Sequence, residues 1–367
     1  MKVIRLKRVQ ITKTYTDRFK NFNGWPTVAT LQDGTLLAAW SNRFFHVCPF
    51  GAVATAYSYD GGYTWSEPKT LFDSPLDDRD GGLCVWGDKV CLTTFTNSKG
   101  MQRNYLQVEA HKYIAQEDIS VMRQKIESVT DEEEREFLGS LYAWSDDGGK
   151  TFGKFEKIPI TAPHGAFVTA DNKVAFIGVD FQDKWQKATF DYLPKGLYIC
   201  QADDNGVFGK PHFLGEPNLP QGCTYCEPHA VCAADGRIVV TIRVEDGKGM
   251  ATIYQSFSFD NGKTLTPFMP TGVNGAPPHL LKTQDGKLLL TYSRRCAPQG
   301  HYVRFSDDNG ESWSEEFCVG EAYEWDQGYA CTAQTNTGDF VTVCYQRDKG
   351  EKVGNHIFAY IWEIIKE

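Results

Sequence analysis

The stretch from Ser58 to Trp65 reads SYDGGYTW, and its pattern of Ser-x-Asp-x-Gly-x-x-aromatic returns along the chain. In such a hairpin turn the aspartate accepts backbone N–H groups, glycine supplies a positive φ, and the last aromatic residue is buried between sheets. One copy would mean little, whereas five copies in order indicate a repeated unit of strands. The other copies are SDDGGKTF at 145–152, a decayed ADDNGVFG at 202–209, SFDNGKTL at 258–265 and SDDNGESW at 306–313.

A second repeat is a two-residue turn between apolar runs, which predicts a hairpin of buried strands. Five of its six copies precede one of the motifs above, so each unit contains four strands. After the sixth copy, residues 355–364 supply an outer strand, and residues 2–12 supply the missing fourth strand. This pairing would close the ring and remove its open edge, so we predict an all-β, six-bladed β-propeller over residues 1–367. The six turn segments are TLQDGTLLAAW, CVWGDKVCLTTF, VTADNKVAFIG, VCAADGRIVVTIR, LKTQDGKLLLTY and TNTGDFVTVCYQ.

One segment departs from this pattern, at residues 105–140 inside the second blade. Thr130 followed by Glu133 fits a capping box that opens a helix, and the preceding residues also have helical character. We therefore predict a helical insertion in this blade. Its acidic run is typical of a solvated face, and the functional alternatives are a lid over the site or a contact through which the chain forms a homo-oligomer.

Composition excludes several partners. The net charge is −9 and no basic run is present, so we expect no nucleic-acid partner. No window reaches the roughly 18 apolar residues of a membrane span, and the first residues lack a signal-peptide core, so we expect a cytoplasmic protein without a membrane partner. A trimmed export signal is the alternative.

The 11 cysteines have no regular spacing, and several lie in apolar strand-like runs, as small buried residues do. Cys223 and Cys226 with His229 have the spacing of half a zinc site, but no second cysteine pair follows at a suitable distance. No phosphate-binding glycine loop is present either. We therefore expect neither a metal nor a cofactor.

Polar residues occur about eight positions before each tight turn and about eight after it. If both turn types share one face of the ring, these residues converge on the opposite mouth, where a concave site is the default expectation. A lone arginine at a strand end is usually an exposed charge, and a lone histidine is usually structural, but recurrence at equivalent blade positions favours function. The converging residues are Trp25, Arg79, Asp80, His164, Glu227, His279, Asp326, Tyr329, Arg43, Asp180, Arg243, Arg294, Arg295 and Arg347.

These segments resemble the sialidase (neuraminidase) superfamily, whose Asp-box (bacterial neuraminidase repeat) propellers the repeats above match outside the insertion. GWPTVATLQDGTLLAAW is similar to the opening Arg-Ile-Pro strand, and CEPHAVCAADGRIVVTIR to the strand pair with the catalytic Glu and the second Arg. DQGYACTAQTNTGDFVTVCYQ resembles the strand with the nucleophilic Tyr. The resemblance thus implies Glu227, Arg243 and Tyr329 for these roles, and Arg295 for the third Arg.

Such a site implies a sialidase-like exo-glycoside hydrolase with a retaining mechanism, acting on the terminal acidic sugar of an oligosaccharide or glycoconjugate. A Tyr has an ordinary pKa near 10, so a carboxylate such as Glu227 must take its proton before the phenolate attacks. A Tyr in place of a carboxylate nucleophile suits an anionic substrate, whose own carboxylate arginines bind with paired hydrogen bonds.

The sequence departs from the family at two places. The family's first Arg falls at Gly24 or Trp25, so Arg43 or Arg79 would have to replace it. The blade-one loop that carries the family's acidic residue has none here, and only His46 could donate a proton there. Asp80 is our choice of acid over Asp78, and the alternative for Asp80 is a structural ion pair with Arg79.

Two other functions stay open at this point. One is a different exo-glycosidase or a uronate lyase that uses Asp80, His164 or His279 as acid or base. The other is a carbohydrate-binding propeller without catalysis, because function depends on the site and not on the fold. The substrate-contacting candidates of the leading hypothesis are Trp25, Arg43, Arg79, His164, Arg243, His279, Arg295 and Asp326.

Overall fold

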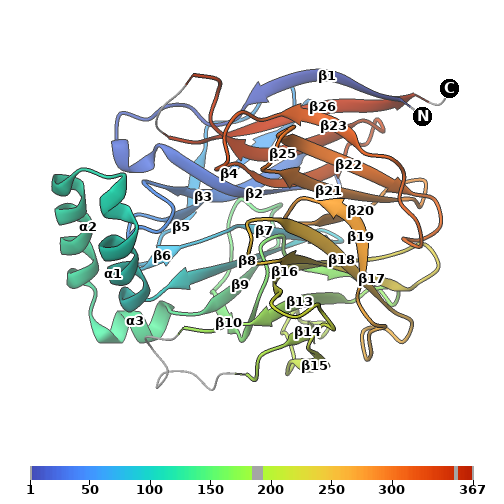
Figure 1. Cartoon of the computed structure of the whole chain (residues 1–367), viewed down its shortest axis with the longest axis horizontal. Coiled ribbons are helices and arrows are strands. Elements are labelled where there is room, and N and C mark those ends of the chain that lie inside the picture. Colours follow the sequence, from blue (N-terminus) through green and yellow to red (C-terminus); the bar gives the residue numbers. More distant parts are fainter. Residues whose placement is uncertain (1, 184–192, 351–353, 366–367) are drawn as a thin grey trace.

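The computed structural model describes residues 2–183, 193–350 and 354–365, whose strands form six antiparallel sheets arranged as a β-propeller (Figure 1). The innermost strands contact one another in ring order from blade one to blade six and back to blade one. The prediction of an all-β propeller with a helical insertion is therefore confirmed. Blade one contains β2 (Phe22–Thr30), β3 (Leu36–Arg43), β4 (Ala52–Ser58) and β5 (Lys69–Phe72).

The inner strands of blades two and three are each split into two pieces that pair with the same second strand. Blade two contains β6 (Asp77–Asp78), β7 (Gly82–Trp86), β8 (Lys89–Asn97), β9 (Ser140–Ser145) and β10 (Glu156–Ile158). Blade three contains β11 (Ile160–Thr161), β12 (Phe167–Val168), β13 (Val174–Asp180), β14 (Leu197–Gln201) and β15 (His212–Gly215).

The last three blades each have four strands, and the N-terminal strand completes the sixth. β1 pairs antiparallel with β26, as predicted, so the ring is closed by a sheet made from both ends of the chain. Blades four and five contain β16 (Thr224–Cys232), β17 (Ile238–Glu245), β18 (Ala251–Ser258), β19 (Met269–Asn274), β20 (His279–Lys282), β21 (Leu288–Arg294), β22 (Gly300–Ser306) and β23 (Phe317–Glu321). Blade six contains β24 (Gly328–Gln334), β25 (Phe340–Gln346), β26 (His356–Ile365) and β1 (Lys2–Gln10).

The Asp-boxes are built as the sequence predicts. In the first box, the Ser58 hydroxyl donates to Asp60 and accepts from the N–H of Gly62 at 2.8 Å, while Asp60 accepts the N–H of Thr64 at 2.8 Å. The box aromatic packs against the preceding blade, as Trp313 does when its indole N–H donates to Gln255 of β18 at 2.7 Å. The box of blade four also contacts the tight turn of blade three, where the Asn261 side chain donates to Asp171 at 3.2 Å, so these two turns share one face of the ring, as predicted.

The helical insertion lies at the opposite face, where β3 and β8 end (Figure 1). It contains α1 (Lys99–Val108), α2 (Gln116–Ser128) and α3 (Asp131–Phe137), with the capping box of Thr130 and Glu133 at the start of α3. The first helix begins before the predicted start at residue 105, because Ser98 caps it directly after β8. Buried residues of the insertion pack on the blade-one loop between β3 and β4, around Cys48.

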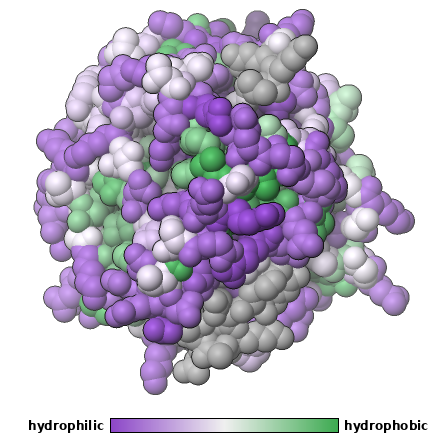
Figure 2. Space-filling view, turned by 90° about the vertical axis from the view of Figure 1, so that its left-hand side faces the viewer, coloured by the Kyte–Doolittle hydropathy of each residue, from purple (hydrophilic) through white to green (hydrophobic). Residues whose placement is uncertain are grey.

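Figure 2 looks onto this face, whose surface is mostly hydrophilic with a few apolar side chains near its middle. None of the helices in the described ranges has the length and apolar character of a membrane span.

Candidate functional site

The inner strands are interrupted at the same level in most blades, on the face that carries the insertion. Residues 79–81 separate β6 from β7, and residues 162–166 separate β11 from β12. In three other blades a bulge occurs at this level, and its residue has a positive φ: Trp25 at 56°, Glu227 at 51° and Tyr329 at 52°. A positive φ is rare for large side chains and is concentrated at functional sites, so these three positions mark the site independently of their chemistry.

Tyr329 and Glu227 meet across the channel. The Tyr329 hydroxyl donates to one carboxylate oxygen of Glu227, and Arg243 Nη1 donates to the other at 2.9 Å. Arg243 also pairs with Glu245. Burial and the Glu227 charge raise the pKa of Tyr329 well above its ordinary value, so Tyr329 is a neutral phenol whose proton already points at a base.

A second tyrosine lies beside the first. Tyr345 of β25 is fully buried with its ring centroid 6.0 Å from that of Tyr329. Its hydroxyl donates to Asp326 at 3.0 Å and accepts from Arg295 Nη2 at 3.3 Å. Arg295 Nε donates to the carbonyl of Gln327 at 3.0 Å. Arg295 and Asp326 therefore lie in one buried network at the edge of Tyr329.

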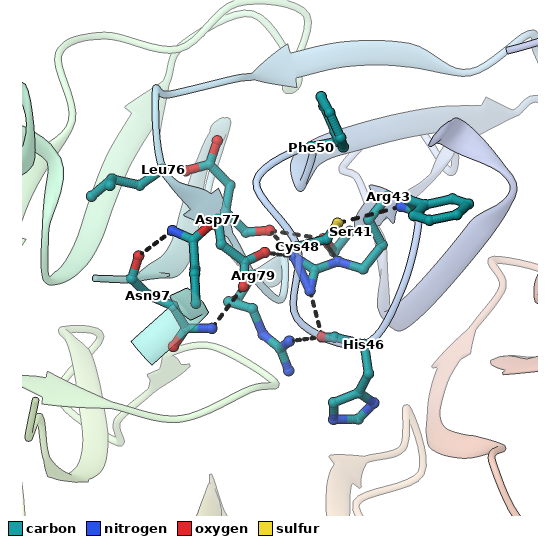
Figure 3. Close-up of polar contacts among 12 residues, drawn as sticks. Ser41, Arg43, His46, Cys48, Phe50, Leu76, Asp77, Arg79 and Asn97 are labelled. Carbon is teal, nitrogen blue, oxygen red and sulfur yellow. Dashed lines mark hydrogen bonds and ion pairs between the residues drawn. The ribbon is translucent and has the colours of Figure 1, made fainter. Parts of the chain in front are cut away.

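Trp25 lies at the bulge of blade one, and the guanidinium of Arg79 from blade two stacks on its indole ring. The Arg79 guanidinium carbon lies 3.9 Å from the indole centroid, a close cation–π contact. Arg79 Nη1 donates to the carbonyl of His46 (Figure 3). The His46 ring packs edge-on against Trp25, with the ring centroids 5.1 Å apart. Arg79 Nη2 makes no hydrogen bond to the described residues, so this nitrogen is open to a ligand.

Asp80 follows Arg79 in the break between β6 and β7. Its carboxylate Oδ1 is buried without a hydrogen-bond partner in the described part of the chain. Burial raises the pKa of Asp80 to about 6, with Arg79 opposing the shift and Glu227 adding to it. The described residues contain no ion pair between Arg79 and Asp80, although the Arg79 charge lowers the pKa of this carboxyl. Asp80 is thus a buried carboxyl that holds its proton at mildly acidic pH.

Arg43, one of the substrate-contacting candidates, is buried beside Trp25, with its guanidinium carbon 4.9 Å from the ring centroid. Its side chain is fully buried, pairs with Asp77, and donates to the carbonyls of Asp78 and His46 at 2.9 Å and 2.8 Å (Figure 3). Asp78 in turn accepts from the backbone and hydroxyl of Ser74. Arg43, at the end of β3, therefore links the loop of blade one to the inner strand of blade two.

The predicted histidines form a cluster below Tyr329 with His229. The ring of His164 lies 5.7 Å from that of His229 and 5.2 Å from that of His279, and 6.2 Å from the Tyr329 ring. His229 and His279 stack at 4.7 Å. Burial lowers the pKa of all three imidazoles, so the cluster is neutral. Both ring nitrogens of His164 lack a partner among the described residues.

The remaining arginine and aspartate candidates lie outside this group. Arg294 pairs with Glu316 at the side of blade five, and Asp180 accepts the N–H of Gly196 at 2.8 Å. The described ranges contain no cluster of three His, Cys, Asp or Glu side chains arranged to hold a metal.

Sequence reasoning missed Tyr345 and gave His229 no role of its own. Tyr345 lies about as far beyond its tight turn as Arg43 and Arg243 lie beyond theirs, so this spacing was an available signal. His229 follows Glu227 by two residues and belongs to the stretch predicted to converge on the mouth, but the only specific role considered for it was in half of a zinc site.

Comparison with known proteins supports the fold. The BNR/Asp-box repeat family matches residues 56–67, and no curated protein matches the sequence. A crystal structure of a protein of unknown function from Dyadobacter fermentans is 18% identical, covers 99% of both chains and has a TM-score of 0.74. The NanB sialidase of Streptococcus pneumoniae is 16% identical over 96% of this chain and 70% of its own, with a TM-score of 0.67.

A third similar structure is the intramolecular trans-sialidase of Ruminococcus gnavus in complex with oseltamivir carboxylate. It is 15% identical, covers 95% of this chain and 96% of its own, and has a TM-score of 0.64. At these identities the likeness concerns the fold. The chain thus contains an Asp-box repeat at residues 56–67 and has a six-bladed propeller fold similar to that of these sialidases.

Proposed function

We propose that this protein is a sialidase-like exo-glycoside hydrolase that releases a terminal acidic sugar with retention of configuration. The observation that carries the proposal is the chain of contacts from Tyr329 through Glu227 to Arg243, with Tyr329 and Glu227 at positive-φ bulges. A buried phenol bonded to a carboxylate is an activated nucleophile. Arginines around it suit a substrate that carries its own negative charge.

In this mechanism, the Tyr329 oxygen attacks the anomeric carbon while its proton passes to Glu227. The bond from the anomeric carbon to the leaving oxygen breaks, and Asp80 gives its proton to that oxygen. Water then attacks the anomeric carbon of the tyrosyl intermediate, Asp80 takes a proton from the water, and Glu227 returns the proton to the Tyr329 oxygen. Two displacements at one carbon give net retention.

The substrate carboxylate would be held by Arg295, Arg243 and Arg79. Arg79 replaces the family's first arginine, because it reaches over Trp25 from the neighbouring blade and keeps Nη2 open. Each Nη atom of Arg243 bears a second hydrogen beyond those used by Glu227 and Glu245. The neutral histidines below Tyr329 add no charge that would compete with these arginines for the carboxylate.

The test is a panel of fluorogenic sialosides and uronosides, measured with the wild-type protein and Tyr329→Phe. We expect release of an acidic sugar by the wild type and loss of turnover in the variant, with binding retained. Full activity of Tyr329→Phe would refute the mechanism. An unsaturated product that absorbs in the ultraviolet would show a lyase instead, and binding without turnover by the wild type would show a lectin-like propeller.

A further inference from the structure

A buried hydrogen-bond network joins Arg295 to Tyr345, Asp326 and Gln327, and the roles proposed for Tyr329 and Asp80 do not account for it. Tyr345 donates to Asp326 at 3.0 Å and accepts from Arg295 Nη2 at 3.3 Å, so its hydroxyl is fixed from both sides. Asp326 immediately precedes Gln327, whose carbonyl accepts from Arg295 Nε at 3.0 Å. Residues 326 and 327 thus contact Arg295 in two ways. The Gln327 carbonyl accepts from it directly, and Asp326 is linked to it through the Tyr345 hydroxyl.

We infer that Tyr345 is a positioning residue that sets the plane of the Arg295 guanidinium for the substrate carboxylate. The inference deepens the proposed function and rests on it. Within the described residues, the guanidinium makes only the two hydrogen bonds above, which use Nε and one hydrogen of Nη2. Both hydrogens of Nη1 and one of Nη2 are left for a ligand, which suits paired binding of a carboxylate.

The two tyrosines have different roles because their surroundings differ. Tyr345 is fully buried, and the carboxylate to which its hydroxyl donates is Asp326, whereas the hydroxyl of Tyr329 donates to Glu227. Burial and the Asp326 charge raise the pKa of Tyr345 well above its ordinary value, so it remains a donor to Asp326. Its ring also packs against Trp25 at 5.9 Å, which connects Arg295 with the blade-one side of the mouth.

The chain contains a matched control for this network. Tyr292 of β21 is also fully buried, and its hydroxyl donates to Glu316, which pairs with Arg294. This second tyrosine, carboxylate and arginine set lies outside the group around Glu227. Removing either hydroxyl deletes one buried hydrogen bond to a carboxylate, so the two variants should lose similar stability.

The experiment compares Tyr345→Phe, Asp326→Asn and Tyr292→Phe. With an acidic-sugar substrate, we expect Tyr345→Phe and Asp326→Asn to raise KM about fivefold to tenfold at nearly unchanged kcat, the effect of losing about one hydrogen bond. Tyr292→Phe should lower the melting temperature similarly but leave KM unchanged. Crystal structures of the variants should show the Arg295 side chain displaced in Tyr345→Phe and unmoved in Tyr292→Phe.

Equal KM values for Tyr345→Phe and Tyr292→Phe, or an unmoved Arg295 in the Tyr345→Phe crystal, would overturn the inference. Failure of the proposed function would look different, because the wild type would then neither cleave nor bind the acidic sugar. In that case the position of Arg295 in the variant crystal alone decides whether Tyr345 positions it.

Discussion

The mouth of the propeller has two halves, blades four to six and blades one and two, which differ in which strands carry the charged residues. Blades four to six contribute Glu227, Arg295 and Tyr329 at the positions that the sialidase resemblance assigns. Blades one and two contribute Trp25 with Arg79 stacked on its ring, where the resemblance expects an arginine on the blade-one strand itself. The bulge with positive φ is common to both halves. The comparison teaches that both halves share the bulged strand geometry, and that the arginine closest to Trp25 comes from the neighbouring blade.

The largest expected effect lies in the half that matches the family. Glu227→Gln keeps the side-chain shape but removes the base for Tyr329, so kcat should fall by about 10²- to 10⁴-fold, the range of general-base catalysis. Steady-state kinetics on an acidic-sugar substrate checks this. The control is Glu245→Gln, because Glu245 pairs with the same Arg243 but lies at the edge of the site. A small effect of Glu227→Gln would remove the distinction between the two halves.

The next largest effect is expected at Asp80 in blade two, in the half of the mouth where the sequence differs from the sialidase pattern. Asp80→Asn should lower kcat by about 100-fold with a poor leaving group and little with an activated aryl leaving group, because only the former needs a proton. The pKa of Asp80 is raised to about 6, so kcat/KM of the wild type should decline as pH rises through about 6. Loss of this decline in the variant identifies the acid, and an unchanged pH profile would exclude Asp80.

The same carboxyl links pH to stability. The folded state holds the Asp80 proton up to about pH 6, whereas the unfolded chain releases it near pH 4. Between these values the folded state binds more protons, so the contribution of this group to stability falls as pH rises. Urea unfolding of wild type and Asp80→Asn at pH 4 and pH 7 should show the variant gaining relative stability at the higher pH.

Arg79 should give a smaller effect that falls on binding. Arg79→Gln removes the charge above Trp25, and we expect KM for an acidic sugar to rise about tenfold with a smaller change in kcat. Arg237→Gln is the matched control, because Arg237 also lies over aromatic rings, those of Phe257 and Phe259, on the Asp-box face. If the two variants behave alike, Arg79 is a structural residue and the mouth has only two substrate arginines.

The smallest effect on catalysis is expected on the opposite face. Asp308 accepts the N–H and hydroxyl of Ser312 in the last Asp-box, and Asp308→Ala should lower stability by about 1 kcal/mol at unchanged kcat and KM. Thermal unfolding and steady-state kinetics together test this. A loss of activity without a loss of stability would show that the two faces are coupled.

Much of the fold could be predicted because its signals are local. The Asp-box and the tight turn each lie within about ten residues, and the unpaired strand near residue 360 required a partner that only the N-terminus could supply. The start of the insertion was placed too late, because Gly100 and the polar residues around it obscured the signal of the Ser98 cap.

The site was predictable only in part, for a different reason. Spacing from a turn tells which residue lies at the mouth, but not which way its side chain points or what lies on the next blade. Arg43 and Arg79 therefore looked equivalent in sequence, and both guanidinium groups lie over Trp25, but only Arg43 is fully buried and bound by Asp77 and two carbonyls. Tyr345 has the same difficulty, because its hydrogen-bond partners Asp326 and Arg295 both lie far before it in the chain.

The most direct measurement is to trap the nucleophile. The wild-type protein is incubated with a fluorinated acidic sugar that carries an activated leaving group, digested, and analysed by mass spectrometry. The mechanism predicts one covalent sugar on the peptide that contains Tyr329, absent in Tyr329→Phe and formed more slowly in Glu227→Gln. An adduct on another residue, or rapid turnover of the sugar with no adduct, would contradict it.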